Sequence, residues 1–338
     1  MSQEPTQANN LTPAEIRQML PEFLTMVRKA HHVAIGTHLN PDGDALGAAL
    51  AVSHVMDQLG VAHTVLCQNT APMNLAFLPG SDRIRQEIEG DFPDLGLILD
   101  LDAMSRLGTV RPIFEAIPQN IVVDHHIPHD APGDLRIIAT KSPAACAILC
   151  DLFFDSEINV TPEIATCLLT GILTDTGSFR FPNTTSHSLH LSAQLLEAGA
   201  SISGVSEEVY MTKSLSSVRM LGRSIERAHI TPDGRLTWVT VPYAVFEELN
   251  ATDQDTEGIV NEMLSIRGVE IAAILREIRP GRIRGSLRSR AHINVAEVAQ
   301  MFGGGGHKNA SGVSFDGSLQ ESEIRIVEAL KACLDSSS

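Results

Sequence analysis

Short apolar runs alternate with amphipathic stretches along the first half of the chain. The runs are rich in Val, Ile and Leu and span residues 33–37, 63–67, 95–100, 120–124 and 136–140. Helical patterns separate them, the clearest from about 45 to 59. Strands that alternate with helices indicate a parallel sheet covered by helices on both faces.

Three further helices are expected around this sheet, over residues 11–30, from 161 to about 173, and at 184–198. The first has Thr12 as its cap and Pro13 at its first position, an arrangement typical of helix starts. Pro21 falls inside the same pattern, so we expect a kink or a restart there.

The pattern changes near residues 190–215. "RLTWVTVP", "VEIAAILREI" and "RIRGSLRS" read as strands, and a Pro-Gly turn joins the last two into a hairpin. A helix capped by Asn294 then ends at the four glycines 303–306. With 338 residues, the chain is long enough for about two domains of ~150 residues.

The formal net charge of −16 bears on the partners. Proteins that hold long nucleic acids need a cation for each phosphate contact, so a long duplex is not expected as a partner. No apolar run reaches the ~18 residues needed to cross a bilayer. The polar start "MSQEPTQANN" resembles no secretory signal. We expect a cytoplasmic protein without a membrane partner.

Coordinating side chains follow several of the expected strands directly. They are His38, Asp42 and Asp44 after the first, Asp100 after the third, Asp124, His125 and His126 after the fourth, and Asp175 at the end of the helix from 161. Ligands of open parallel sheets bind beyond the carboxyl ends of the strands. These side chains are therefore expected to share one crevice.

Any one of these aspartates could simply cap a helix, Asp44 in particular. Together, however, the carboxylates would repel one another unless cations neutralise them. Two divalent metal ions bridged by a shared carboxylate would supply that charge. Histidine and aspartate ligands without a thiolate favour Mn²⁺ or Mg²⁺.

Five motifs in order now identify a family resemblance. "HLNPDGDALG", "LDLD", "VVDHH" and "LTDTGSFRF" resemble the motifs of the DHH phosphoesterase superfamily, and "GGGGHKNASG" resembles the signature of the DHHA1 domain. The motif set is most similar to the bacterial nano-RNase/oligoribonuclease (NrnA-type) group. The resemblance implies a DHH catalytic domain at 12–190, a helical linker at 191–215 and a smaller α/β DHHA1 substrate-binding domain with a mixed sheet at 216–334. A cleft is expected between the two domains.

The resemblance also implies roles for single residues. One metal would be held by His38, Asp42 and Asp100, and the other by Asp44, Asp100, His125 and Asp175. Asp124 would orient a ligand imidazole. The catalytic residues would be Asp100 as the bridge, His126 facing the scissile phosphate, and Arg106 nearby.

In the second domain, the resemblance implies that substrate is bound by Arg288, Ser289, Gly305, Gly306, His307 and Asn309. The other arginines between 276 and 290 are interpreted mostly as a solvated face. The chain departs from the family pattern at Asp130 and over Lys141–Ala145, within the stretch "KSPAAC", which affects expected phosphate contacts but no metal ligand.

The function implied is hydrolysis of short oligonucleotides and dinucleotides to 5′-mononucleotides, with two metal ions activating water. Removal of the 3′-phosphate of pAp, or hydrolysis of linear or cyclic dinucleotides, would use the same metal site and remains an alternative. A non-catalytic nucleotide sensor would have lost metal ligands, and all the positions are intact. RNA or DNA as substrate, cleavage polarity and a homodimer stay open.

Overall fold

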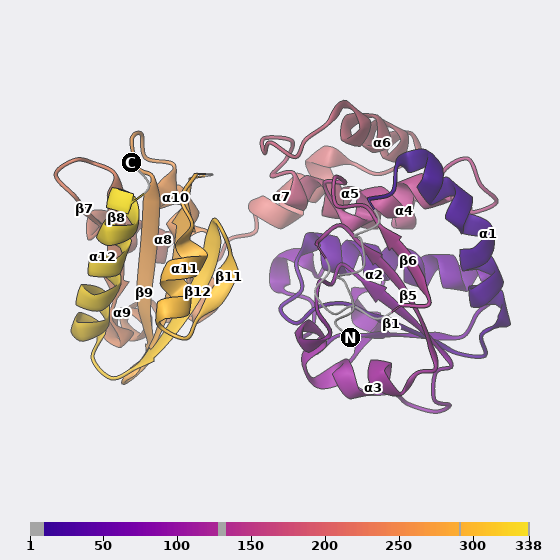
Figure 1. The fold of residues 1–338 in the computed structure, drawn as a ribbon, viewed down its shortest axis with the longest axis horizontal. Helices are drawn as coiled ribbons and strands as arrows, with labels where there is room; N and C mark the ends of the chain where they lie inside the picture. Colours follow the sequence, from indigo (N-terminus) through magenta and orange to yellow (C-terminus); the bar gives the residue numbers. More distant parts are fainter. Residues whose placement is uncertain (1–9, 128–132, 291, 337–338) are drawn as a thin grey trace, which may run out of the picture. The chain divides into compact units, whose positions relative to one another are not determined.

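The computed structural model describes residues 10–127, 133–290 and 292–336, except for the side chains of His307 and Ser336. The chain divides into two compact units after Thr212 (Figure 1). Asp130, one of the two departures from the family pattern, lies outside the described residues.

The first unit is built on a six-stranded sheet. Its strands are β1 (Val33–Gly36), β2 (His63–Leu66), β3 (Ile84–Arg85), β4 (Leu95–Leu99), β5 (Gln119–Asp124) and β6 (Leu135–Ile138). The order is β3-β2-β1-β4-β5-β6 and every pair is parallel, which confirms the predicted sheet. β3 is a short edge strand that the apolar pattern did not predict.

The helices of this unit are α1 (Pro13–Lys29), α2 (Gly43–Leu59), α3 (Arg111–Ala116), α4 (Ala145–Phe153), α5 (Pro162–Asp175), α6 (Ser186–Glu197) and α7 (Ile202–Tyr210). Short 3₁₀ turns lie at η1 (Met73–Leu75), η2 (Ser81–Arg83) and η3 (Met104–Val110). Helix α1 continues through Pro21, and the Thr12 cap is present.

The side chains of alternate strand residues pack into two different hydrophobic cores, one on each face of the sheet. Ile35 of β1 packs with α2, α4 and α5 on one face, while Ala34 packs with η3 and α3 on the other. On that second face Phe114 lies where a side chain on Gly36 would be. The sheet is therefore buried on both sides, and polar side chains can be tolerated only at its ends.

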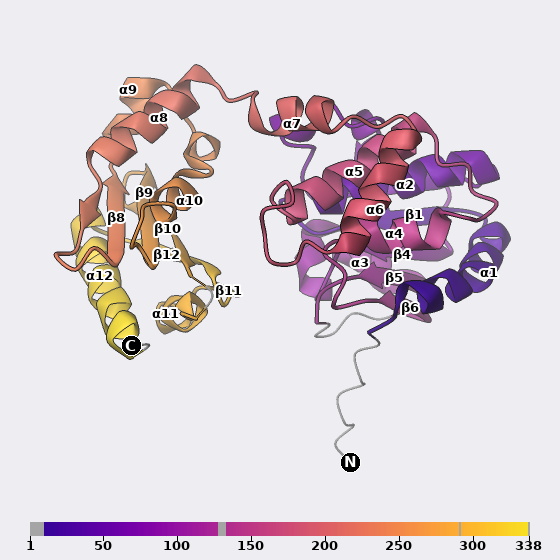
Figure 2. The same ribbon diagram turned by 90° about the horizontal axis from the view of Figure 1, so that it is seen from above.

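The second unit holds a mixed sheet of order β11-β12-β10-β9-β8-β7 (Figure 2). Its elements are α8 (Leu215–Glu226), β7 (His229–Ile230), β8 (Leu236–Val241), α9 (Tyr243–Leu249), η4 (Asp253–Thr256), α10 (Ile259–Leu264), β9 (Ile271–Arg279), β10 (Arg282–Ser289), α11 (Val295–Met301), β11 (Gly305–His307), β12 (Ala310–Asp316) and α12 (Leu319–Ser336). Strands β8 and β9 run parallel and the other pairs are antiparallel, as a mixed sheet requires.

Helices cover this second sheet unequally. Helices α11 and α12 pack on one face around Leu287 and Ile326, and α8, α9 and α10 pack on the other around Met220 and Ile274. The predicted hairpin is present, with β9 and β10 joined through Gly281, whose φ of 74° suits a glycine. No helix of the described residues is long and apolar enough to cross a bilayer.

Candidate metal centre

Three adjacent strands of the first sheet end at one edge, where polar side chains gather. The connections from β1 and from β4 run to opposite sides of the sheet, so these two strands flank its switch point. The side chains at this edge are His38, Asp42 and Asp44 after β1, Asp100 after β4, Asp124, His125 and His126 at the end of β5, and Asp175 at the end of α5. The buried strands thus bring the polar residues together.

The first group consists of His38, Asp42 and Asp100, whose ligand atoms lie within 4.8 Å of one another. The His38 ring donates through Nδ1 to the carbonyl of Leu39 at 2.9 Å. Its Nε2 lies 3.7 Å from Asp42 Oδ2 and 3.5 Å from Asp100 Oδ2. A backbone bond on one ring nitrogen leaves the other directed at the carboxylates, as metal-binding histidines require.

The second group consists of Asp44, His125 and Asp175, again with ligand atoms within 4.8 Å of one another. Nε2 of His125 lies 3.8 Å from Asp44, 3.4 Å from Asp175 and 3.3 Å from Asp100. Its Nδ1 faces the carbonyl of Ser142 at 3.3 Å. The structure thus brings together both sets of residues that the family resemblance assigned to two metals.

Asp100 contacts both groups, because one carboxylate oxygen faces His38 and the other faces His125. Its φ is 53°, a left-handed conformation that is uncommon outside glycine. The Asp100 amide donates to the carbonyl of Val123 at 3.0 Å, which ties this turn to β5. Strained backbone of this kind persists where neighbouring structure holds it and is frequent at functional sites.

Asp44 is held by the backbone of a helix distant in sequence. Its two carboxylate oxygens accept from the amides of Ala145 and Cys146 at 2.6 and 2.9 Å, at the start of α4. The cap of α2 is instead Asp42, whose Oδ1 accepts from the amides of Asp44 and Ala45. Asp42 therefore caps a helix with one oxygen and faces His38 with the other.

The partners of Asp44 were not found from the sequence. The segment Lys141–Ala145 was marked only as a departure from the family pattern, yet it supplies the Ala145 amide and the Ser142 carbonyl. Backbone groups leave no signal in residue type, and this pairing spans 101 positions.

The shifted pKa values of these side chains reflect the negative charge that the cluster holds. Burial opposes charge on the imidazoles, but contact with Asp100 raises the pKa of both His38 and His125 to about 10. Burial and the Asp100 charge raise the pKa of Asp44 to about 7, and burial and Asp44 raise that of Asp175 to about 9. Asp100 is buried too, but the imidazoles of His125 and His38 keep its pKa well below the usual range.

Two carboxylate oxygens at this edge of the sheet, Asp100 Oδ1 and Asp124 Oδ2, are buried without a well-directed hydrogen bond. An unpaired buried acceptor costs about 1–3 kcal/mol, more for a charged group, unless a cation compensates it. Carboxylate and imidazole donors without a thiolate are the set that hard or intermediate divalent cations prefer. The residues present therefore fit divalent metal ions.

The remaining residues predicted for catalysis lie beside this cluster. His126 donates from Nδ1 to Asp124 Oδ1 at 2.9 Å and lies 3.5 Å from Asp100. Asp124 thus contacts the imidazole of His126, whereas His125 is oriented by Ser142. Arg106, in η3, pairs with Asp102 at 3.3 Å, and its carbonyl accepts from the amide of Leu39.

In the second unit, Ser289 and Asn309 are engaged within the protein. The Asn309 amide donates to Ser289 Oγ, to the Arg290 carbonyl and to the Ile293 carbonyl at 2.7–3.0 Å. The Ser289 hydroxyl donates to the same Ile293 carbonyl at 2.9 Å. These bonds tie the end of β10 to the turn before α11, so neither side-chain donor is left over for a ligand.

Arg288 and the glycine strand have different surroundings. Arg288 is half-buried, donates to the Leu287 carbonyl and has no carboxylate partner among the described residues, and burial lowers its pKa. Gly305 and Gly306 lie in β11, and a side chain on Gly306 would meet the carbonyl of Ala310 at 2.5 Å. The glycine at 306 is thus required by close approach to β12, whatever else it binds. His307 ends β11, and its side chain is outside the described part.

Comparisons with known proteins agree with the two units. The DHH family, N-terminal domain, matches residues 32–172, and the DHHA1 domain matches residues 240–336. A protein of Thermus thermophilus named bifunctional oligoribonuclease and PAP phosphatase NrnA is 30% identical over 318 residues, which cover 94% of each chain. A Bacillus subtilis protein of the same name is 24% identical over 300 residues, covering 88% of this chain and 93% of that one.

Among solved structures, an exopolyphosphatase-related protein from Bacteroides fragilis is similar with a TM-score of 0.86 and 27% identity, covering 93% of this chain and 96% of that one. RecJ from Thermus thermophilus, solved in complex with Mn²⁺, has a TM-score of 0.56 and 15% identity, covering 97% of this chain and 56% of RecJ. The second likeness is one of fold alone.

Proposed function

The chain belongs to the DHH family of phosphoesterases and carries a DHHA1 domain, and from this premise we propose that it hydrolyses short oligonucleotides and dinucleotides to 5′-mononucleotides. The observation that carries the proposal is the cluster of carboxylates and imidazoles around Asp100 at the ends of β1, β4 and β5. The similar Thermus and Bacillus proteins are named oligoribonucleases, which supports this substrate class.

Removal of the 3′-phosphate of pAp is the second candidate activity. The same relatives are also named PAP phosphatases, and one phosphoester site can serve both reactions. The net charge of −16 favours short substrates in either case, because a long strand would need many cationic contacts. A cytoplasmic location and a cleft between the two domains, both expected from the sequence, remain predictions.

We propose Mn²⁺ as the cofactor, with two ions bound. His38, Asp42 and Asp100 would hold one, and Asp44, Asp100, His125 and Asp175 would hold the other. Bound divalent cations activate a water molecule as nucleophile and neutralise charge that develops on the phosphoryl oxygens.

The chain's own residues prepare the site for this chemistry. The Leu39 and Ser142 carbonyls orient His38 and His125, and the start of α4 fixes Asp44. Asp124 holds the ring of His126, and although burial opposes charge on that ring, Asp124 raises the pKa of His126. A cationic imidazole held in this way can donate a hydrogen bond to a phosphoryl oxygen. Arg106, beside Asp102, would contribute a second positive charge at the same edge.

For recognition of the far end of the substrate, we propose Arg288, the backbone of Gly305 and Gly306, and His307. A half-buried guanidinium without an acidic partner among the described residues is prepared to receive an anion. Ser289 and Asn309, which the sequence also assigned to substrate, would act by fixing the end of β10 on which Arg288 lies.

The test is a turnover panel with purified protein and Mn²⁺. Diribonucleotides and trinucleotides should be degraded to 5′-mononucleotides far faster than a long single strand, and pAp should yield AMP and phosphate. Equal rates on dimers and on a long strand would point to an open, tracking nuclease and contradict the proposed substrate class.

A further inference from the structure

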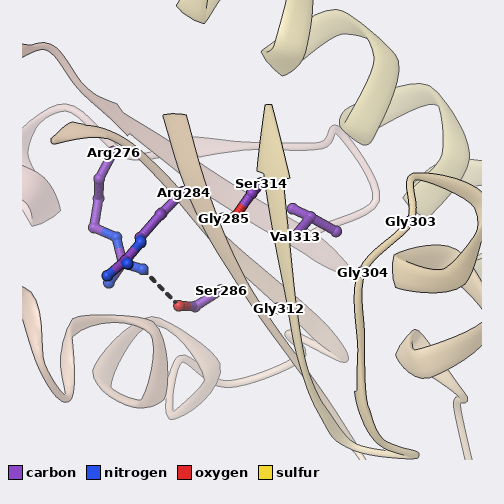
Figure 3. A pocket seen from close by; sticks show the side chains of 9 residues that line it. All are labelled: Arg276, Arg284, Gly285, Ser286, Gly303, Gly304, Gly312, Val313 and Ser314. Atoms are coloured by element: carbon purple, nitrogen blue, oxygen red, sulfur yellow. Dashed lines mark hydrogen bonds between the residues drawn. The ribbon is translucent and has the colours of Figure 1, made fainter. Parts of the chain in front are cut away.

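A cavity of about 280 Å³ lies on the second sheet, and none of the residues to which the proposed function assigns a role lines it. Its walls are the side chains of Arg276, Arg284 and Ser286, and the backbone of Gly303, Gly304 and Gly312 (Figure 3). The sequence pattern had suggested a solvated face for these arginines.

Strand register explains why the polar side chains meet here. Arg284 of β10 pairs with Arg276 of β9, and Ser286 pairs with Gly312 of β12. Side chains on one face of a sheet recur every second residue, so Arg284, Ser286 and Arg288 share a face with Arg276. In Figure 3 the two guanidinium groups lie together beside Ser286. The absence of a side chain at Gly312 leaves space in front of them.

The side chain of Arg276 is buried and hydrogen-bonded, unlike that of a solvated arginine. Its guanidinium donates to Thr256 Oγ1 at 2.9 Å and to Ser286 Oγ at 3.0 Å, and only 13% of its side chain is exposed. Arg282, on the neighbouring strand β10, shows the contrast, because it pairs with the exposed Asp316 at the end of β12. The position of the Arg276 guanidinium is therefore fixed before any ligand arrives.

The charges at the cavity do not balance. Asp253 lies 3.4 Å from Arg276 and 3.0 Å from Arg284, so a single carboxylate serves two guanidinium groups. Arg288 is close enough to act on Arg276: burial lowers the pKa of Arg276, and the charges of Arg284 and Arg288 oppose its ionisation further. Excess positive charge in a partly buried concavity attracts an anion.

Asp253 is a fixed counter-ion. It begins η4, and the neighbouring Asp255 accepts hydrogen bonds from Ser214 and Ser216 at 2.5 and 2.9 Å. Asp255 also accepts from the Thr252 amide at 2.8 Å. Because Asp255 ties η4 to the start of α8, Asp253 lies beside the arginines and competes with any incoming anion.

We propose that this cavity is a second anion subsite, which takes a phosphate group of a nucleotide ligand beyond the group bound by Arg288. Arginine suits this role because its planar donors match phosphate oxygens. The glycines let the ligand approach the backbone closely. Identification of the ligand as the oligonucleotide substrate rests on the proposed function, and the existence of the subsite does not.

Calorimetry of the full chain in EDTA tests the subsite without turnover. The probes are the diribonucleotide ApA, its two forms with one further terminal phosphate, pApA and ApAp, and inorganic phosphate. We expect pApA or ApAp to bind more tightly than ApA. Arg284→Gln should lower the affinity for the more tightly bound of these two probes about 10-fold, as loss of a charged hydrogen bond does. It should leave the affinity for ApA unchanged within about 2-fold.

Two further variants make the test specific. Arg282→Gln removes the same charge from the same strand outside the cavity and should leave the affinity for all probes unchanged. Asp253→Asn removes the internal competitor and should strengthen binding of the probe with the additional phosphate. Equal losses in Arg284→Gln and Arg282→Gln, or none in either, would overturn the subsite. Tighter binding of inorganic phosphate alone, without discrimination between pApA, ApAp and ApA, would overturn its assignment to a nucleotide. A protein that binds pApA through Arg284 but hydrolyses no oligonucleotide in Mn²⁺ would contradict the proposed function and leave the subsite standing.

Discussion

Replacing Asp100 by Asn should remove more metal affinity than any other single change that keeps the fold. Asp100 lies 3.3–3.5 Å from the imidazoles of His38, His125 and His126, and it contacts both candidate ligand groups. Loss of a residue that merely supports a metal ligand lowers affinity about 10–100-fold. Loss of a ligand shared by two ions should therefore cost about 100-fold or more in Mn²⁺ affinity, and hydrolysis should fall at least as far.

Asp102→Asn is the matched control, because Asp102 lies two positions further along the chain and contacts Arg106 but belongs to neither ligand group. An isolated ion pair of this kind is worth about 0–1 kcal/mol, so its loss should change Mn²⁺ affinity by about 5-fold or less. Titration calorimetry with Mn²⁺ measures both variants, and thermal unfolding in EDTA shows that each still folds. Two tight Mn²⁺ sites in Asp100→Asn would refute the assignment of the shared ligand.

Two other expectations follow from the same contacts. Arg288→Gln should lower kcat/KM on diribonucleotides about 10–100-fold and change little on a small aryl phosphodiester, because remote contacts act only on a substrate that reaches them; equal losses on both would place Arg288 in the chemical step. Mn²⁺ binding near neutral pH should release protons, since metal-free His38 and His125 have pKa values of about 10 and ligand imidazoles must be neutral. Protons compete less with Mn²⁺ for the imidazoles as pH rises, so Mn²⁺ affinity should increase with pH. Calorimetry in buffers of different ionisation enthalpy measures the number of protons released. An Mn²⁺ affinity that is independent of pH would contradict His38 and His125 as ligands.

The strand ends of the first unit were predictable because two simple patterns coincide there. Apolar runs identify β4 and β5 as buried strands, and the polar residues that follow them must then lie at one edge. The order of the motifs added the family. Nothing more than the sequence was needed to expect Asp100, His125 and Asp175 close together.

Contacts made by backbone groups, or between residues far apart in the chain, could not be predicted from the sequence. The α4 amides that hold Asp44 carry no residue signature, and the turn at Asp100 with a φ of 53° is visible only once β4 and β5 are paired. The arginines of β9 and β10 read as a solvated face because their common counter-ion, Asp253, precedes them by more than 20 positions. The pairing register of β9 and β10 places these arginines at one cavity, and this register is known only once the sheet is assembled.

The most direct test of the central claim is hydrolysis of a diribonucleotide by exhaustively chelated protein, before and after Mn²⁺ is restored. Four aspartates, Asp100 among them, and three histidines lie together at the strand ends, and their charge requires cations for the proposed chemistry. We expect no turnover in EDTA and recovery of 5′-mononucleotide release with Mn²⁺. Undiminished release of mononucleotides by the chelated protein would contradict it.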